Sequence, residues 1–433
     1  MISSATDEQW SFAHRLIFRF FFLYLVYWLA PWGWLTDVPG MPFINDIYLR
    51  ATGFLVTTAN RLVFHLKDEL VPYGGSGDTS FGWAETYFAL LLSVVGCVIW
   101  TLADRKRPNY VRLNYWLCLF TRYCVAMVAL SYGIIKLFLL QMPYPSLSQL
   151  ATPLGDYLPM RFAWMFVGYS NTYQFFSGFM EVLTGLLLLY RRTTTLGVML
   201  GMVVFANIFI MNMSYDIPVK IYSFHLLLMC IFLLTNEWKR ISCFFIYNRA
   251  AEPCSIYHFR WKTRPFRMAR VILKAGFVFL FIVLPVIRAY EAYKSELADH
   301  SIFPLAKGIY AVEVFAVNGD TLPVPVYENE RWQDLIFDKY GEGSMRTTDT
   351  SFPIRYNRAH FNYKTDTAAR VIELMSGMDS VPVIRFNYQP VDTASLELTA
   401  IRGKDSIQML IRRMPRHFQL AENQFHWMTE YIR

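Results

Sequence analysis

The chain has 433 residues, of which 55% are hydrophobic and only 17% are charged, whereas an average soluble domain has about 25% charged residues. Residues 1–290 carry a net charge of +11 and residues 291–433 a net charge of −3. This excludes a soluble enzyme and a disordered tail protein. Because the basic excess lies among apolar runs, it also argues against a nucleic-acid partner. The sequence predicts an α-helical polytopic membrane protein with a small soluble domain at its C-terminal end.

Seven segments are apolar enough, and at roughly 20 residues long enough, to cross a bilayer as helices. They are residues 16–36, 82–102, 113–141, 171–190, 194–214, 217–235 and 270–289. The first segment is too long and too aromatic for a signal peptide, so we expect a retained anchor. About seven spans are therefore predicted.

Positive charges are concentrated in alternate loops. The basic loops contain Arg105, Lys106, Arg107, Arg112, Arg191, Arg192, Lys239, Arg240, Arg249, Arg260, Lys262, Arg264, Arg267 and Arg270. The intervening loop 142–170 has only Arg161. Because cytoplasmic loops are enriched in Lys and Arg, we expect a cytoplasmic N-terminus, and an odd number of spans puts the C-terminal domain outside. Four prolines make a regular helix in loop 142–170 unexpected.

These patterns divide the chain into five parts. They are an N-terminal two-span region with an external loop (1–112), a four-helix bundle (113–236), a basic cytoplasmic loop (237–269), a seventh span (270–290) and an exported β-domain (291–433).

Short alternating runs begin near Gly308 and predict the β-domain. Asn318-Gly319 and Gly403-Lys404 are typical of hairpin turns, because Asn and Gly tolerate positive φ. Many short strands with turns between them favour a small antiparallel barrel or sandwich. Residues 367–376 fit a short helix or a strand, and residues 291–307 a helical linker. The histidines of this domain are dispersed and the chain has no CxxC pair, so we expect no metal.

Ionisable side chains within the spans are the candidate site. At the bilayer centre each costs a few kcal/mol, so such residues face the bundle interior or water. Lys136 lies near the outer end of the third span and Glu181 near the middle of the fourth, and these two are the candidate catalytic residues. Candidate binding residues in the outer half of the membrane are Tyr132, Glu85, Asn212, Asp216, Lys220 and His225.

Two readings of these residues stay open. Lysines can extend to the interface, and Lys136 can pair with Glu181 to hold two helices together. Alternatively, the set lines a polar pocket that opens outward and binds a quinone headgroup, a lipid headgroup or a small sulfur compound. Gln174, Gly178, Glu181 and Gly185 share one stripe at helical spacing, with small residues that allow a neighbouring helix to come close.

Several motifs resemble the DoxX family of membrane proteins. They are Tyr132-Gly133-Ile134-Ile135-Lys136-Leu137, then Glu181-Val182-Leu183-Thr184-Gly185-Leu186-Leu187-Leu188, then Arg191-Arg192-Thr193. This match covers about residues 113–236. Met213 to Lys220 resembles a Bacteroidetes version with extra spans and a C-terminal β-domain, and that resemblance covers nearly the whole chain.

The resemblance implies a fold and several functions. It implies a DoxX-like four-helix core in the bacterial inner membrane, with the β-domain in the periplasm. DoxX relatives include the small subunit of a thiosulfate:quinone oxidoreductase, and the wider group is similar to the membrane part of vitamin-K-dependent carboxylase. There a lysine serves as base, and Lys136 holds the matching Lys-Leu position.

Two functions follow as hypotheses. The first is an accessory or scaffold subunit that binds lipid or quinone in the outward pocket and docks an envelope partner, in the periplasm or the membrane, through its β-domain. The second is a subunit of a quinone-linked oxidoreductase, or a carboxylase-like enzyme, that uses Lys136 and Glu181. We favour the first because the sequence contains no flavin, haem or thiol motif. The cofactor stays unidentified, with a quinone as the candidate.

Overall fold

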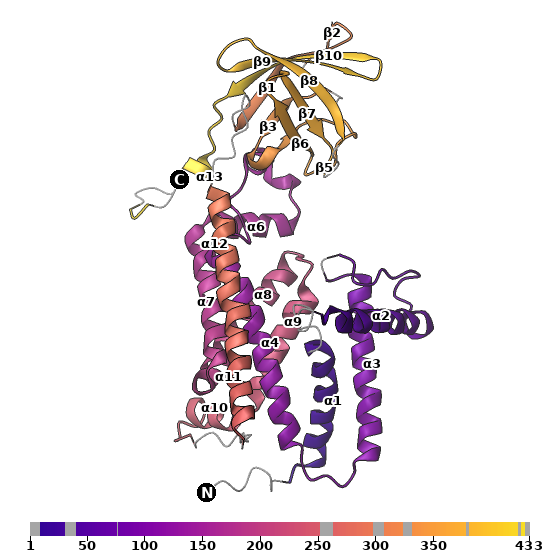
Figure 1. Ribbon diagram of the computed structural model, residues 1–433, viewed down its shortest axis with the longest axis vertical. Helices are drawn as coiled ribbons and strands as arrows, with labels where there is room; N and C mark the ends of the chain where they lie inside the picture. The colour runs from indigo at the N-terminus through magenta and orange to yellow at the C-terminus, as the bar shows by residue number, and fades with distance from the viewer. Residues whose placement is uncertain are drawn as a thin grey trace. The chain divides into compact units, whose positions relative to one another are not determined.

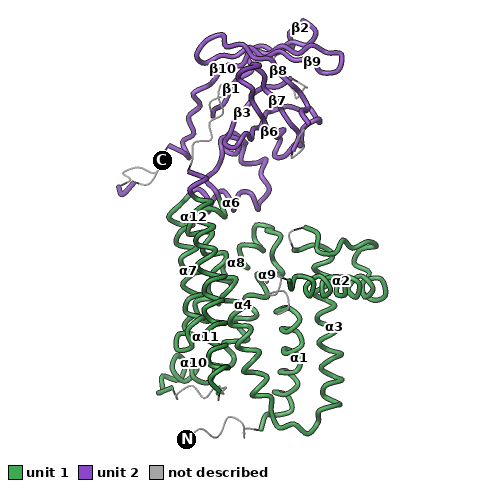
Figure 2. Tube along the Cα trace, in the orientation of Figure 1, with its two compact units in different colours: residues 1–142, 170–293 green, residues 143–169, 294–433 purple. Residues whose placement is uncertain are grey.

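A computed structural model describes residues 9–30, 40–75, 77–251, 263–297, 307–323, 331–377, 381–422 and 426–428. The chain forms two compact units, shown in green and purple in Figure 2. Unit 1 comprises residues 1–142 and 170–293, and unit 2 comprises residues 143–169 and 294–433.

Unit 1 is helical. Its elements are α1 (Phe12–Leu29), α2 (Pro42–Ala59), the π-helical turn η2 (Asn60–Phe64), α3 (Ser80–Ala103), α4 (Val111–Leu137), α7 (Asn171–Leu189), the 3-10 turn η4 (Arg191–Thr193), α8 (Thr194–Ser214), α9 (Lys220–Thr235), α10 (Trp238–Phe245), α11 (Arg264–Val278), the π-helical turn η5 (Phe279–Val283) and α12 (Leu284–Leu297), which continues into unit 2. Among the described residues, six helices are long and apolar enough to cross a membrane. The number rises to seven if α9 and α10, which meet at a 77° bend, form one span.

The prediction of several apolar helices is therefore confirmed. The first predicted span, 16–36, extends beyond α1, because α1 ends at Leu29 and Ala30 adopts a left-handed φ of 36°. The seventh predicted span, 270–289, is longer in the structure, where the helix runs from Arg264 to Leu297. Residues 31–39 lie outside the described residues, as do residues 252–262 of the predicted basic loop and 298–306 of the predicted linker.

Helix α2 was not predicted from the sequence. It starts with Pro42 in its first turn, where proline is tolerated because its missing N–H has no helical partner. In Figure 1 it runs across the neighbouring α3 rather than alongside it. The side chains of Phe43, Ile47 and Phe54 are more than half exposed, which gives α2 an apolar outer surface.

Four helices form the centre of unit 1. Helix α4 packs on α7 and α9, and α8 packs on α7 and α9, so the four close into a bundle. Their core consists of fully buried side chains that include Val125, Ala126, Leu130 and Cys230. Helix α1 packs on α3 and α4 and adds Leu25 to the same core.

Unit 2 contains an antiparallel β-barrel. Its strands are β1 (Gly308–Val317), β2 (Asp320–Thr321), β3 (Asp334–Phe337), β4 (Glu342–Met345), β5 (Ile354–Arg355), β6 (Arg358–Asp366), β7 (Val371–Met375), β8 (Pro382–Pro390), β9 (Ser395–Arg402) and β10 (Asp405–Met414). Neighbours pair in the order β10-β9-β8-β7-β6-β4-β3-β1, and β1 also pairs with β10. Eight strands therefore close the barrel, with β2 and β5 as short additions to β1 and β6.

The turn chemistry explains the register. Asn318 and Gly319 have φ values of 55° and 88°, and Gly403 has a φ of 64°, so these residues make the tight turns that the sequence predicts. Residues 371–375 form a strand, which resolves the alternative left open there, and the barrel excludes a sandwich. Side chains of Phe337, Phe361 and Phe386 fill the interior, as expected for eight strands.

Residues 143–169 belong to unit 2, although the helices before and after them in the sequence, α4 and α7, belong to the bundle of unit 1. They form α5 (Leu147–Ala151), the 3-10 turn η3 (Leu154–Asp156) and α6 (Pro159–Tyr169). The expectation that the prolines prevent a regular helix here was wrong for α6, because Pro159 stands at its start, where proline fits.

An aspartate from the barrel holds this segment. The carboxylate of Asp338 accepts hydrogen bonds from the backbone N–H groups of Leu147 (2.9 Å) and Ser148 (3.1 Å), and from the Ser148 hydroxyl (2.6 Å). Both Ser148 and Asp338 are buried. The segment is therefore an integral part of unit 2.

Candidate functional site

The two predicted catalytic residues meet in the contact between α4 and α7. Lys136 Nζ and Glu181 Oε1 form an ion pair. Lys136 is 6% exposed and Glu181 is 1% exposed. Both charges are therefore buried within the protein, where each compensates the other. A buried pair of this kind holds its partners in one geometry, because removal of either partner leaves an uncompensated buried charge.

Glycines make this contact possible. A Cβ on Gly178 would lie 2.7 Å from Lys136 Cβ and 2.8 Å from the Gly133 carbonyl oxygen. A Cβ on Gly133 would lie 2.8 Å from the backbone nitrogen of Val182. Such distances leave no room for a methyl group, so α4 and α7 pack backbone to backbone beside the ion pair.

Two neighbours of the pair on the same helices behave differently. Gln174, from the predicted stripe, is buried, and its Oε1 accepts a hydrogen bond from the backbone N–H of Met142 at 3.1 Å. This bond satisfies a backbone group just after α4. Tyr132 is 43% exposed, and its hydroxyl has no hydrogen-bond partner among the described residues. Tyr132 is therefore available at the outer surface of the helical unit.

His225 belongs to a second polar group, between α9 and α1. Its Nε2 lies 2.7 Å from the Tyr24 hydroxyl, and its Nδ1 lies 2.7 Å from the Ile221 carbonyl oxygen. The indole of Trp28 stacks on the imidazole at 3.8 Å. Both ring nitrogens of this buried histidine are therefore occupied.

Asn212 joins α8 to α9. Its Nδ2 donates to Ser223 Oγ at 2.9 Å, and both residues are buried. The backbone carbonyl of Asn212 accepts from Ile217 at 3.0 Å, which shapes the turn between the two helices. The side-chain amide and the backbone carbonyl of Asn212 are therefore both used in hydrogen bonds that shape the contact between α8 and α9.

Glu85 forms a third group, on α3. Its carboxylate accepts a hydrogen bond from the Tyr27 hydroxyl at 3.1 Å. Tyr27 is buried in a cluster with Tyr24, so α1 carries a tyrosine toward His225 and another toward Glu85.

Lys220 and Asp216 form a fourth group at the start of α9. Lys220 Nζ lies 2.7 Å from Asp216 Oδ1 and 3.6 Å from Asp78 Oδ2. Asp78 also accepts hydrogen bonds from the backbone N–H groups of Lys220 (2.7 Å) and Ile221 (2.9 Å). Asp78 thus caps α9, whereas Thr79 caps its own helix α3 through Gly82.

Six of the eight predicted residues thus fall into four local groups, whereas Asn212 pairs with Ser223 and Tyr132 is exposed. The sequence located the paired Lys136 and Glu181, but it missed Tyr24, Tyr27 and Trp28, whose aromatic character reads equally well as membrane-interface residues. It also missed the role of Arg19, which is 2% exposed and donates to Tyr110 Oη and the Asp104 carbonyl oxygen. A basic residue inside the first apolar segment was the available signal for that site.

The described residues contain no group of three or more His, Cys, Asp or Glu that could hold a metal ion. The described cysteines, Cys97, Cys118, Cys124, Cys230 and Cys243, are free thiols, and Cys254 lies outside the described residues.

Comparisons with known proteins give one partial relative. A stretch of 78 residues, 18% of this chain, is 41% identical to the uncharacterized protein YwoB of Bacillus subtilis (strain 168) and spans 51% of that protein. No family model matches the chain, and no solved structure matches it. The DoxX resemblance of the sequence therefore stays a prediction.

Proposed function

We propose that this protein is a scaffold or accessory subunit of the bacterial inner membrane, with a DoxX-like helical core that binds lipid or quinone and a periplasmic β-barrel that docks an envelope partner. The observation that carries the proposal is the Lys136–Glu181 pair, buried in a contact that glycines close. An ion pair in this setting fixes the arrangement of two helices.

The surface of the helices supports insertion into a membrane. On α3 the side chains of Val94, Val98, Ile99 and Leu102 are each at least half exposed, apolar and adjacent. An apolar face of this extent requires a lipid or protein neighbour. Lipid is a suitable neighbour for these helices, because a helix satisfies its own backbone hydrogen bonds and needs no water to do so.

The charges support the orientation. The ends of α3, α7 and α9 and the beginnings of α4, α8 and α11 lie at one end of unit 1 (Figure 1). Arg112 and Arg267 lie in the first turns of α4 and α11, and Arg107, Arg191 and Arg240 follow the ends of α3, α7 and α9. The positive-inside rule assigns this end to the cytoplasm.

The barrel supports docking and not catalysis. Its interior is filled by the aromatic cluster that includes Trp332, Phe352 and Phe386, so its outer surface is what it offers to a partner. The ligand of the helical unit belongs next to Tyr132, the exposed neighbour of the pair on α4.

The alternative is a catalytic subunit, of the quinone-linked or the carboxylase-like type, in which Lys136 and Glu181 exchange protons. The observation that favours it is the direct contact of an acid and a base. The two functions differ in what happens when both charges are replaced together.

The test compares Lys136→Met, Glu181→Gln and the double variant Lys136→Met/Glu181→Met. Loss of one partner of a buried pair costs about 3–5 kcal/mol, whereas replacement of both by apolar residues is close to neutral. We therefore expect each single variant to lower the amount of folded protein in membranes. The double variant should restore that amount, together with the yield of the complex that the protein forms with its partner. A double variant of normal abundance that has lost all complex activity would favour the enzyme.

A further inference from the structure

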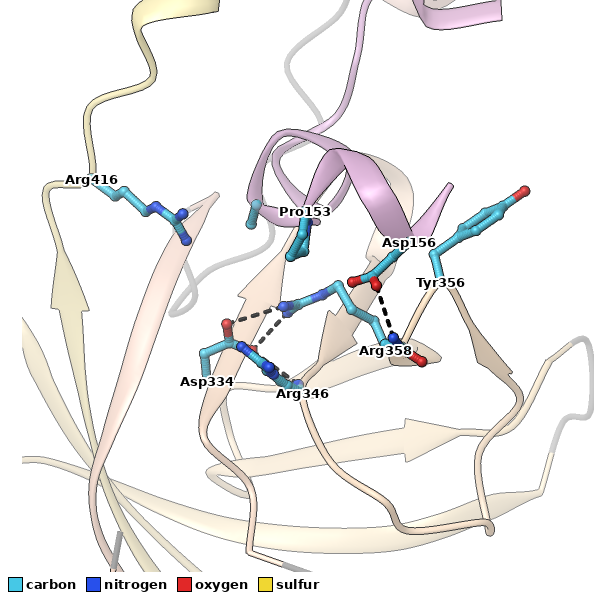
Figure 3. A pocket seen from close by; sticks show the side chains of 9 residues that line it. Pro153, Asp156, Asp334, Arg346, Tyr356, Arg358 and Arg416 are labelled. Carbon is cyan, nitrogen blue, oxygen red and sulfur yellow. Dashed lines mark hydrogen bonds and ion pairs between the residues drawn. The ribbon is translucent and has the colours of Figure 1, made fainter. Parts of the chain in front are cut away.

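Unit 2 contains a cavity of about 140 Å³ between the segment 143–169 and the barrel (Figure 3). Pro153 and Asp156 line it from the segment, and Asp334, Arg346 and Arg358 line it from the barrel, together with Arg416, which follows β10. An engineered cavity of about 150 Å³ holds a benzene molecule. The cavity therefore fits a ligand group of a few heavy atoms.

Two of the residues that line the cavity, Arg358 and Asp334, form an ion pair. Arg358 is 3% exposed and donates from its two terminal nitrogens to the carboxylate of Asp334, at 2.7 and 3.1 Å. Its Nε donates to Ser344 Oγ at 2.9 Å, and that hydroxyl donates to Ser148 Oγ at 2.7 Å. Arginine has five N–H donors, and Arg358 uses three of them in these bonds to Asp334 and Ser344.

Two further arginines bring charge that no carboxylate balances. Arg346 and Arg416 are both exposed, and neither guanidinium has a hydrogen bond or an ion pair to a described residue. Arg416 lies over the ring of Phe418 at 5.0 Å. The carboxylate of Asp334 is bound by Arg358 and also accepts the backbone N–H of Arg346 at 3.0 Å, so it does not compete for either guanidinium.

The remaining wall is strained. Tyr356 and Asn357, at the turn between β5 and β6, both have a φ of 55°, which is unfavourable for a bulky side chain such as tyrosine. Asn357 Nδ2 donates to Asp156 Oδ1 at 2.9 Å. This bond engages the second carboxylate of the cavity and ties the turn to the segment.

We propose that this cavity binds a small oxyanion, a carboxylate or a phosphate group, through the arginines that line it, Arg346, Arg358 and Arg416. Three arginines against two aspartates leave one positive charge. The planar guanidinium donates in pairs to oxyanions of this kind. The site lies wholly within unit 2 and does not depend on the Lys136–Glu181 pair.

The test is isothermal titration calorimetry on the full-length protein in a maltoside detergent, with inorganic phosphate, acetate and the soluble lipid dihexanoyl phosphatidic acid in separate titrations. We expect at least one of the three to bind. Binding of phosphate or acetate alone identifies a free anion, and binding of the lipid alone identifies a headgroup. Arg346→Gln and Arg416→Gln should each weaken binding by about tenfold or more, because each removes a charged hydrogen bond.

The matched control is Arg385→Gln, an exposed arginine on β8 that pairs with Glu373 on the barrel surface. It removes the same charge away from the cavity and should leave the affinity unchanged. Because Arg346 and Arg416 are exposed, their replacement leaves the fold intact, and the thermal unfolding of each variant checks this. Failure of all three ligands to bind, or an equal loss in Arg385→Gln, would overturn the proposal.

Discussion

At the scale of single residues, the helical unit depends on positions where a side chain is either absent or paired. Gly178 is one of the first kind, because its Cα hydrogen faces Lys136 across the helix contact. Lys136 and Glu181 are of the second kind. The two features depend on each other, because the glycines let the helices come close enough to bury the ion pair.

Gly178→Ala should therefore destabilise unit 1. The new methyl group would lie within 3 Å of Lys136 Cβ and of two backbone atoms. Overpacking of this kind costs about 1–3 kcal/mol, partly offset by about 1 kcal/mol from the better helix propensity of alanine. Thermal unfolding in detergent should show a lower midpoint.

Gly276→Ala is the control for this experiment. Gly276 lies in α11, and a Cβ built on it meets nothing within 4 Å. The substitution should be neutral or slightly stabilising. Equal midpoints for Gly178→Ala and the wild type would contradict a tight contact between α4 and α7.

The sequence identified part of this site. Helical spacing placed Gln174, Gly178, Glu181 and Gly185 on one stripe, and all four are buried. It could not identify the partners of His225, because Tyr24 and Trp28 come from α1, about 200 residues away. Pairing between distant helices leaves no local pattern, and such contacts were therefore invisible in a single sequence.

At the scale of elements, helix ends are fixed by residues from other parts of the chain. Asp78 comes before α3, yet its carboxylate accepts the first N–H groups of α9. The next residue, Thr79, is the one that caps α3. The bond from Asp78 therefore links the loop before α3 to the start of α9.

Asp78→Ala should loosen the start of α9. Loss of an N-cap carboxylate typically costs about 1 kcal/mol, and here two N–H groups lose their acceptor. Hydrogen exchange measured by mass spectrometry should become faster in peptides covering residues 220–225, while peptides of the barrel strands stay unchanged.

Asp216→Asn separates capping from simple loss of charge. Asp216 also contacts Lys220, but its side chain is 83% exposed, and an exposed ion pair contributes little. Asparagine also tolerates the left-handed backbone at this position, where φ is 49°. If this variant increased exchange as much as Asp78→Ala, capping would not be the role of Asp78.

Strands were easier to predict than helix packing, for a physical reason. The Asn318-Gly319 turn and the alternation around it are encoded in about ten consecutive residues, and the structure contains the hairpin there. Closure of the barrel by β1 and β10 joins residues nearly 100 positions apart, so the choice between barrel and sandwich needed the structure. Helix α2 was missed because its segment mixes Asp46 and Arg50 with apolar residues.

At the scale of the whole molecule, the two units differ in what their residues present. Unit 1 offers apolar helices with internally balanced charges, and unit 2 offers a closed barrel with an arginine-lined cavity. We propose lipid or quinone contact for the first unit, and partner docking and anion binding for the second. These assignments can fail independently, since each depends on residues of one unit.

The most direct test of the central claim is mass spectrometry of the small molecules that co-purify with the protein in mild detergent, comparing the wild type with the double variant Lys136→Met/Glu181→Met. Because the ion pair acts in helix packing, we predict that a lipid or quinone is retained in near-stoichiometric amount by the wild type and also by the double variant. A quinone that the wild type retains and the well-folded double variant loses would contradict the scaffold function and favour direct use of Lys136 and Glu181 in quinone chemistry.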